Sequence, residues 1–171
     1  MLSVREIQLS DIPLLCSYWF DATPEYMRGM GVDLSKMPTR QEWVDMLTEQ
    51  IETKNYADKK AYCMIWLQDG GPVGHSNINK IVFADHAYMH LHLWNAGSRK
   101  KGVGTAFVKL TVPHFFEKYQ LKHLYSEPYA LNPAPHRTLE KAGFRFVKEY
   151  TCVPGWINFE QRVKLWEFSQ G

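Results

Sequence analysis

Cysteine is scarce in this chain, and long hydrophobic runs are absent. The three cysteines, Cys16, Cys63 and Cys152, are far apart and odd in number. That pattern fits neither a disulfide framework nor the ligand spacing of a zinc site. No stretch approaches the roughly 20 apolar residues that cross a bilayer, and the first residues lack the apolar run of a signal peptide. We therefore expect a protein of a reducing cytoplasm with no membrane partner.

A strong excess of one charge is also missing. Lysine and arginine number 20, aspartate and glutamate 18, and the formal net charge is +2. This balance argues against a nucleic-acid partner. Hydrophobic residues make up 45% of the 171 residues, and there is no repeat or flexible linker, so we expect one domain over residues 1–171. Aromatic residues reach 14%, with six tryptophans, which suggests a core or a cleft lined with flat rings.

Hydrophobic periodicity and turn residues predict a mixed α/β chain. Strands are expected over residues 2–9, 61–68, 72–83, 87–94, 121–125, 144–153 and 158–168. Helices are expected over residues 12–20, 40–54, 102–119 and 132–142, the third of them bent at Pro113. Residues 23–38 contain several Pro and Gly and are expected to form a loop or a broken turn. The order of elements indicates one twisted sheet flanked by helices.

A basic, glycine-containing turn is expected where the strand ending near Trp94 leads into the helix that starts at Gly102. Its sequence is Arg99-Lys100-Lys101-Gly102-Val103-Gly104-Thr105. A helix N-terminus presents unpaired N–H groups and the positive end of its dipole to an anion. Glycines let a phosphate approach the backbone, and the three cations add charge. The alternative is a basic surface loop whose glycines serve only the turn. Neither a Walker loop nor a dinucleotide fingerprint matches, because no Gly-Lys-Ser/Thr and no third glycine is present.

A second motif, Asn132-Pro133-Ala134-Pro135-His136-Arg137-Thr138-Leu139-Glu140-Lys141-Ala142-Gly143-Phe144, follows the next expected strand. The basic turn resembles the Arg/Gln-x-x-Gly-x-Gly loop of the GNAT acetyltransferase superfamily. The second motif resembles that superfamily's Asn-helix-Gly-Phe segment, and it is closest to the branch of ribosomal-protein N-terminal acetyltransferases (RimJ/RimL-like). The expected order of elements agrees over nearly the whole chain. The resemblance implies a GNAT-like fold with a single mixed, mostly antiparallel sheet.

The resemblance also implies where acetyl-coenzyme A binds. The strands 87–94 and 121–125 would splay apart and hold the pantetheine arm between them, and the turn at Gly102 would hold the pyrophosphate. Asn132 would reach the pantetheine arm, although an Asn before Pro is also a good helix cap. The residues expected to bind the donor are Leu93, Trp94, Arg99, Lys100, Lys101, Gly102, Val103, Gly104, Thr105, Asn132 and Lys141.

The chain departs from the family where a proton donor for the leaving thiolate is often found. Relatives place Ser at the position of Pro135 or Tyr at the position of Leu139, and neither hydroxyl is present. Tyr129, His136 or water would replace it, or the thiolate leaves unaided.

A general base is useful because an amine with a pKa near 10.4 is mostly protonated at neutral pH. Alternation along the strand places His86, Tyr88, His90 and His92 on one face. In the family a base commonly sits on this strand, so His90 or His92 is the expected base, and Glu127 is the other candidate. The alternative is that these rings pack under a helix with their nitrogens hydrogen-bonded.

The acceptor wall is expected from the first helix and the loop after it, and from the loop between the last two strands. The first region supplies Tyr18, Asp21 and Tyr26, and the second supplies Trp156. Aromatic faces and carboxylates suit a cationic amine. These aromatics would otherwise be core or oligomer contacts.

The predicted function is transfer of an acetyl group from acetyl-coenzyme A to a primary amine, by direct attack in a ternary complex without a metal. The acceptor is a small-molecule or peptide amine, and a second copy of the chain is a candidate partner. One alternative is a coenzyme A-binding regulator that has lost catalysis. Another is a metal-binding protein, because His86, His90 and His92 share one side of a strand.

Overall fold

The structure is a computed structural model that describes residues 1–95, 97, 99 and 102–170. Its strands are β1 (Leu2–Glu6), β2 (Ala61–Gln68), β3 (Gly71–Val82), β4 (His86–Leu93), β5 (His123–Ser126), β6 (Arg145–Cys152) and β7 (Gln161–Ser169). Its α-helices are α1 (Ile12–Phe20), α2 (Pro24–Gly29), α3 (Arg40–Glu52), α4 (Val103–Tyr119) and α5 (Pro133–Lys141). Short 3-10 helices occupy Leu9–Asp11, Leu34–Lys36 and Tyr56–Asp58.

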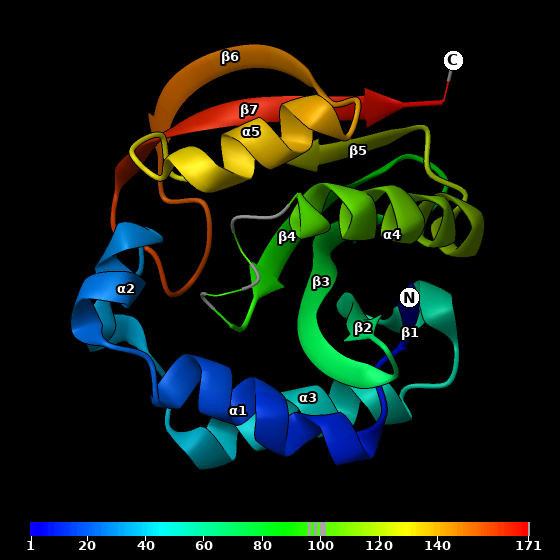
Figure 1. Cartoon of the computed structure of the whole chain (residues 1–171), viewed down its shortest axis with the longest axis vertical. Helices are drawn as coiled ribbons and strands as arrows, with labels where there is room; N and C mark the ends of the chain where they lie inside the picture. The colour runs from blue at the N-terminus through cyan, green and yellow to red at the C-terminus, as the bar shows by residue number, and fades with distance from the viewer. Residues whose placement is uncertain (96, 98, 100–101, 171) are drawn as a thin grey trace.

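The seven strands form one sheet in the order β1-β2-β3-β4-β5-β7-β6 (Figure 1). Every neighbouring pair is antiparallel except β4 and β5, which are parallel and pair only from His86–His123 to Tyr88–Tyr125. This confirms the expected single, mixed and mostly antiparallel sheet flanked by helices.

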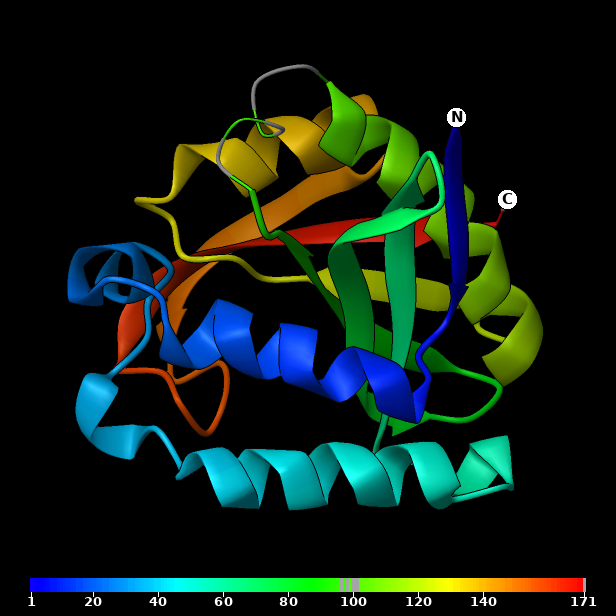
Figure 2. The same ribbon diagram turned by 60° about the horizontal axis from the view of Figure 1, so that its bottom comes forward.

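Two hydrophobic layers lie on opposite faces of the sheet, and alternation along β2 shows how they separate. Tyr62, Met64 and Trp66 belong to a core shared with α4 and α5, whereas Cys63 and Ile65 belong to a core shared with α1, α2 and α3. This is the period-2 pattern of a strand buried on both faces. Figure 2 shows α1 and α3 lying together on their side of the molecule.

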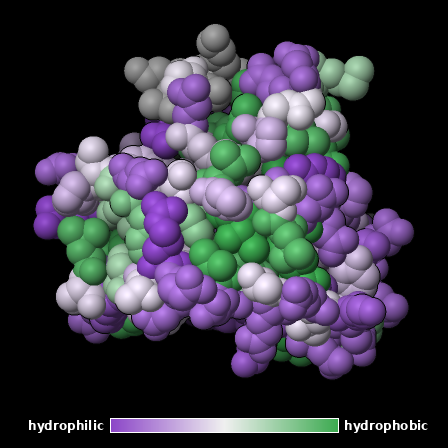
Figure 3. All heavy atoms as spheres, turned by 90° about the horizontal axis from the view of Figure 1, so that it is seen from below, coloured by the Kyte–Doolittle hydropathy of each residue, from purple (hydrophilic) through white to green (hydrophobic). Residues whose placement is uncertain are grey.

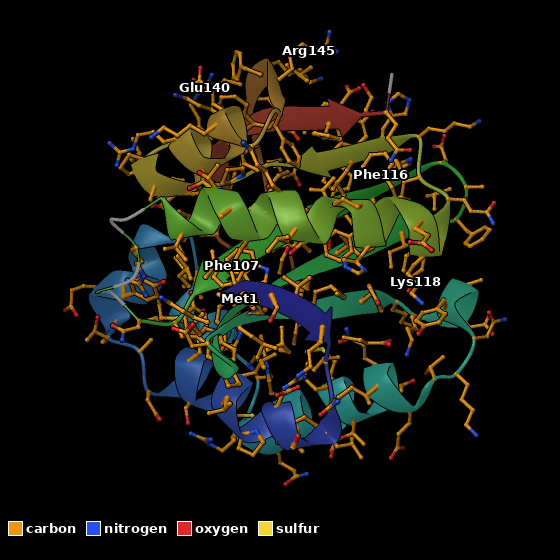
Figure 4. All side chains as sticks on the ribbon, turned by 45° about the vertical axis from the view of Figure 1, so that its right-hand side comes forward. Met1, Phe107, Phe116, Lys118, Glu140 and Arg145 are labelled. Atoms are coloured by element: carbon orange, nitrogen blue, oxygen red, sulfur yellow. The ribbon has the colours of Figure 1, made fainter. Side chains whose placement is uncertain are left out.

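The helix α4 is anchored to the sheet by aromatic packing. The ring of Trp66 stacks on Phe107 with centroids 4.9 Å apart, and the Trp66 Nε1–H donates to Thr111 Oγ1 at 2.9 Å. Figure 4 shows α4 crossing the sheet with Phe107 and Phe116 on it, and both side chains are buried. Because α4 is held along its length, its first turn is fixed at one end of β4.

The expectation of a loop or a broken turn over residues 23–38 was wrong for part of this segment. Residues Pro24–Gly29 form α2, and the Thr23 hydroxyl caps it by accepting from the Tyr26 N–H at 3.2 Å. Pro24 stands in the first turn, where its missing N–H has no intrahelical partner to lose. The proline therefore starts a helix here instead of interrupting one.

None of the described helices is both long and apolar enough to span a bilayer. Figure 3 shows the face on which α1 and α3 lie, where hydrophobic side chains gather near the centre and hydrophilic ones surround them. Leu9, Leu14 and Met46 are exposed hydrophobic residues in this part of the chain.

Candidate active site

The strands β4 and β5 separate just before the middle of β4. Past Tyr88 and Tyr125 no backbone pair joins them in the described residues, and the Ser126 hydroxyl donates to Met89 O at 2.8 Å where they part. The Trp94 N–H bonds to Val73 O of β3 at 2.9 Å. Backbone N–H and C=O groups point to alternate sides along a strand. Those of Met89, Leu91 and Leu93 therefore point away from β3, toward the side on which β5 has diverged. This edge can pair with an extended amide-containing arm, whereas the N–H of Trp94 is already used.

The turn before α4 has the backbone geometry that the sequence suggested. Gly102 is the N-cap residue with φ +70°, a left-handed conformation that costs glycine little. The first turn that follows, from Val103 to Thr105, presents N–H groups and the positive end of the α4 dipole. Lys100 and Lys101, two of the expected cations, lie outside the described residues.

Gly104 has room that the protein itself does not fill. A Cβ atom built there would lie 3.6 Å from Leu93 Cδ1 and 3.6 Å from Thr138 Cγ2, which are ordinary contacts. Packing alone therefore does not require glycine at this position. Close approach of an anion to the backbone is a reason for glycine here that packing does not supply, and in this respect the turn fits the diphosphate of acetyl-coenzyme A.

Arg99 bridges this turn to β4 and α2. Its Nε and Nη2 donate to Leu93 O at 3.1 and 3.0 Å, and its guanidinium lies 4.5 Å from the centre of the Tyr26 ring. The cation is thus held beside the backbone edge that would receive the donor.

The second sequence motif forms α5 and lies alongside α4. Asn132 is the N-cap residue of α5 but its side chain makes no capping hydrogen bond, which argues against the simple cap. Lys141 is exposed in the last turn of the helix. Leu139 is fully buried. His136 accepts from Trp166 Nε1–H at 3.0 Å and its Nε2–H donates to Tyr129 O at 2.9 Å, so both of its nitrogens serve the core and neither is free for a leaving group.

A cavity of about 390 Å³ lies on the α1–α3 side of the sheet. Its wall is built by α1, α3, β2, β3, β4 and the loop between β6 and β7, and includes His90, His92 and Trp156. Three indoles stand in that wall: Trp19 and Trp43 have centroids 5.2 Å apart, and Trp43 stacks on Trp156 at 6.0 Å with an interplanar angle of 18°.

Three histidines in the cavity wall are kept neutral by burial. Burial and the neighbouring Lys80 lower the pKa of His90 to about 4, and burial with His90 nearby lowers the pKa of His75 to about 3. Burial also holds the pKa of His92 well below its ordinary value. Removing an ionisable ring from water disfavours its charged form. All three are therefore uncharged proton acceptors or donors at neutral pH.

Each of these rings is oriented by a hydrogen bond. Asn79 Oδ1 lies 3.1 Å from His90 Nε2, and an amide oxygen there places the proton on Nε2 and leaves Nδ1 as a lone-pair acceptor. Trp94 Nε1–H donates to His75 Nδ1 at 2.8 Å. The Tyr18 hydroxyl lies 2.9 Å from His92 Nδ1. His90 and His92 therefore have hydrogen-bonded rings and also line the cavity, and the role of either as the base stays a prediction.

The neutral histidines predict a loss of stability in weak acid. The unfolded chain protonates histidine near pH 6.5 and the folded rings resist protonation to about pH 4, so the unfolded state binds more protons in between. The contribution of these rings to the free energy of unfolding is fully present above about pH 6.5. It falls as the pH drops, by about 1.4 kcal/mol per pH unit for each such ring. His75→Gln keeps an acceptor for the Trp94 N–H. It should reduce the difference between the free energies of unfolding measured with urea at pH 6.5 and at pH 5. Parallel pH dependences for both proteins would contradict the assignment.

The other expected site residues lie outside the cavity wall. Tyr18 is buried behind His92, and its hydroxyl also meets that of Tyr26 at 2.8 Å. Asp21 is exposed and pairs with Arg40 at 3.3 Å. Glu127 is held by the Tyr150 hydroxyl and by Lys80 Nζ at 3.3 Å. Lys80 also donates to Pro154 O at 2.7 Å, so Lys80 links Glu127 to the β6–β7 loop that carries Trp156.

Several wall residues were missed by the sequence reading. His75, Asn77 and Asn79 face the cavity from β3, and their alternation in the sequence was a usable signal for one polar face. Trp43 was predicted only to lie in the helix expected over residues 40–54. In the described residues, no three His, Cys, Asp or Glu side chains gather as a metal site.

A family model described as an acetyltransferase (GNAT) domain matches residues 2–145. The chain belongs to the GNAT acetyltransferase family. It is an acetyl-CoA-dependent N-acetyltransferase, and the expectation drawn from the two motifs is confirmed. No curated protein shows significant sequence similarity to it.

Three solved structures illustrate the shared fold. A ribosomal-protein-S5-alanine acetyltransferase from Vibrio fischeri is 18% identical with a TM-score of 0.78, and the match covers 98% of this chain and 92% of that one. A spermidine N-acetyltransferase from Vibrio cholerae, in complex with CoA and spermine, is 15% identical with a TM-score of 0.78 over 99% and 95%. Aminoglycoside acetyltransferase AAC(6')-Ib, with coenzyme A and kanamycin, is 15% identical with a TM-score of 0.76 over 99% and 95%.

Proposed function

We propose that the chain acetylates a primary amine held in the cavity, with the donor bound along β4 and the first turn of α4. The observation that carries the proposal is that both sites meet on one strand. The side chains of His90 and His92 line the cavity, while the backbone of Leu91 between them turns to the side where β5 diverges. An amine in the cavity is thereby brought to the donor across one strand, which is the arrangement direct transfer needs.

The donor is held by the residues around the α4 turn. Acetyl-CoA supplies the acetyl group as a thioester. The backbone of Leu91 and Leu93 pairs with the pantetheine arm, and the amides from Gly102 to Thr105 bind the pyrophosphate. Arg99, Lys100 and Lys101 add positive charge. The Asn132 side chain, which makes no capping hydrogen bond, reaches the pantetheine arm, and Lys141 binds near the nucleotide.

His90 is the proposed base. The cavity disfavours charge, so the pKa of a bound ammonium falls and the neutral amine is the reactive form. As the new N–C bond forms and the C–S bond breaks, the amine nitrogen releases a proton to His90 Nδ1 and the sulfur keeps the electron pair. Because Pro135 and Leu139 carry no hydroxyl, the thiolate leaves as an anion. His92, fixed by Tyr18, positions the amine beside His90.

A reducing, cytoplasmic setting is proposed from the cysteines. Cys16 and Cys63 are buried free thiols, a state that a reducing compartment preserves. The alternative of a regulator without turnover is disfavoured by the family match and by the neutral histidines that face the cavity.

The decisive test is release of the coenzyme A thiol from acetyl-CoA in the presence of a broad panel of amines. We expect thiol release that depends on both acetyl-CoA and an amine, with the acetylated amine detected by mass spectrometry. Tight donor binding with no thiol release from any amine would contradict catalysis and leave the regulator.

A further inference from the structure

We infer that Asn77 determines acceptor specificity by binding an uncharged amide group attached to the carbon that bears the amine. The acceptor is then an α-amino amide, the arrangement found in an amino-acid amide and at the N-terminus of a peptide. This inference rests on the proposed function and narrows its substrate class. Three observations carry it: the place of Asn77 beside His90, its unpaired carboxamide, and the lack of charge around it.

Asn77 lies directly opposite the proposed base. It pairs with His90 in the register of β3 and β4 and with Cys63 in the register of β2 and β3, and all three residues line the cavity. The side chains of directly paired residues start roughly 5 Å apart on the same face of a sheet. An amine bound at His90 Nδ1 would therefore hold a group on its neighbouring carbon within reach of the Asn77 carboxamide.

The Asn77 carboxamide is unpaired and accessible. Asn79, its neighbour on the same face, is used by His90 Nε2 at 3.1 Å, whereas no hydrogen bond joins the Asn77 side chain to another residue that the structure describes. The amide atoms of Asn77 are also absent from the enclosed atoms without a partner in this part of the chain, so the half-buried amide is open to the cavity. A carboxamide offers both an acceptor and two donors. Its complement is a second amide, which donates to Oδ1 while its carbonyl oxygen accepts from Nδ2.

The surroundings of Asn77 favour a neutral group over a carboxylate. The three histidines of the cavity wall are uncharged at neutral pH, because burial lowers their pKa values. The one cation in the described part of the wall is Lys60. It is three residues from Cys63, which pairs with Asn77, and this spacing corresponds to roughly 10 Å along a strand. A carboxylate next to the amine would thus leave water without a cation to pair with, which is costly.

The test compares kcat/KM of the purified full-length protein for L-alaninamide, trialanine, L-alanine, sec-butylamine and spermidine at saturating acetyl-CoA. Each concentration is expressed as that of the uncharged amine, so that differences in basicity are removed. We expect L-alaninamide to exceed L-alanine and sec-butylamine by about tenfold or more. Faster turnover of trialanine would place the amide in a peptide and faster turnover of L-alaninamide in a small molecule, and either result supports the inference.

Two other outcomes separate the inference from the proposed function. A preference for L-alanine, sec-butylamine or spermidine over both amides would overturn the inference while leaving acetyl transfer intact. Absence of thiol release with every amine of a broad panel would instead defeat the proposed function.

Asn77→Leu removes the amide and keeps the branched outline of the side chain. Its fold should persist, because the Asn77 side chain makes no hydrogen bond within the described residues, and thermal unfolding checks this. The ratio of kcat/KM for L-alaninamide to that for sec-butylamine should fall by about tenfold. The reactivity of each amine and the active fraction of each protein cancel when this ratio is compared between the two proteins.

Thr53→Val is the matched control, because it removes from the cavity wall a hydroxyl that already donates to Glu49 O at 2.7 Å. This variant should retain the ratio of the parent protein. A general loosening of the wall would lower kcat/KM for both amines and leave their ratio as it is. An unchanged ratio in Asn77→Leu would therefore overturn the role of Asn77.

Discussion

Gly104→Glu is expected to weaken binding of acetyl-CoA by about 100-fold or more, a change of about 2.7 kcal/mol in binding free energy. The side chain would add bulk to the first turn of α4, and its carboxylate would repel the phosphates that this turn is proposed to bind. Isothermal titration calorimetry with acetyl-CoA measures the effect directly.

Two control variants separate this effect from damage to the fold. Gly104→Ala adds only a Cβ, whose nearest neighbours would be Leu93 and Thr138 at 3.6 Å. It should raise or preserve the melting temperature, because alanine is favoured over glycine in helices by about 1 kcal/mol. Leu110→Glu places the same charge on an exposed position of α4 and should leave affinity within about twofold. A Gly104→Glu protein that folds and binds like the parent would contradict the site.

His90→Gln is expected to lower kcat by about 100-fold, the lower end of the usual contribution of a general base. Glutamine can still donate to Asn79 Oδ1 but cannot take up a proton. Donor affinity should be unchanged, because the His90 side chain faces the cavity and not the α4 turn. Steady-state kinetics with saturating acetyl-CoA, together with calorimetry of donor binding, separates the chemical step from binding.

A comparison along the same strand tests the choice of base. His86→Gln changes a residue that pairs with Asp85 at 2.7 Å outside the cavity wall, and kcat should be retained. His92→Gln should raise KM for the amine more than it lowers kcat, since His92 is proposed to position the amine. If His92→Gln abolishes turnover and His90→Gln does not, the base is His92 and the present assignment fails.

The turn and helix starts that are proposed to bind the donor could be predicted because their signals are local. Glycine at 102 and 104 after basic residues marks a helix N-terminus in sequence, and Gly102 indeed adopts a positive φ. Asn132 before Pro133 likewise marks the start of α5. Alternation also placed His90 and His92 on one face of a strand before any tertiary structure was known.

The cavity proposed to bind the amine acceptor could not be predicted in this way, because its wall is assembled from elements far apart in the sequence. Trp43 reaches the cavity only because α3 packs on the sheet face that also carries His75 and Asn79, and no local pattern encodes that meeting. Tyr18 was expected in the wall but lies behind His92, since a buried aromatic in a helix looks the same in sequence whether it faces ligand or core. A homodimer remains a prediction.

A crystal structure with coenzyme A tests the central claim most directly. We predict the pyrophosphate on the amides from Gly102 to Thr105, with the pantetheine arm along Leu91 and Leu93 and its sulfur beside His90. Coenzyme A bound elsewhere, with the first turn of α4 covered by protein side chains, would contradict the account.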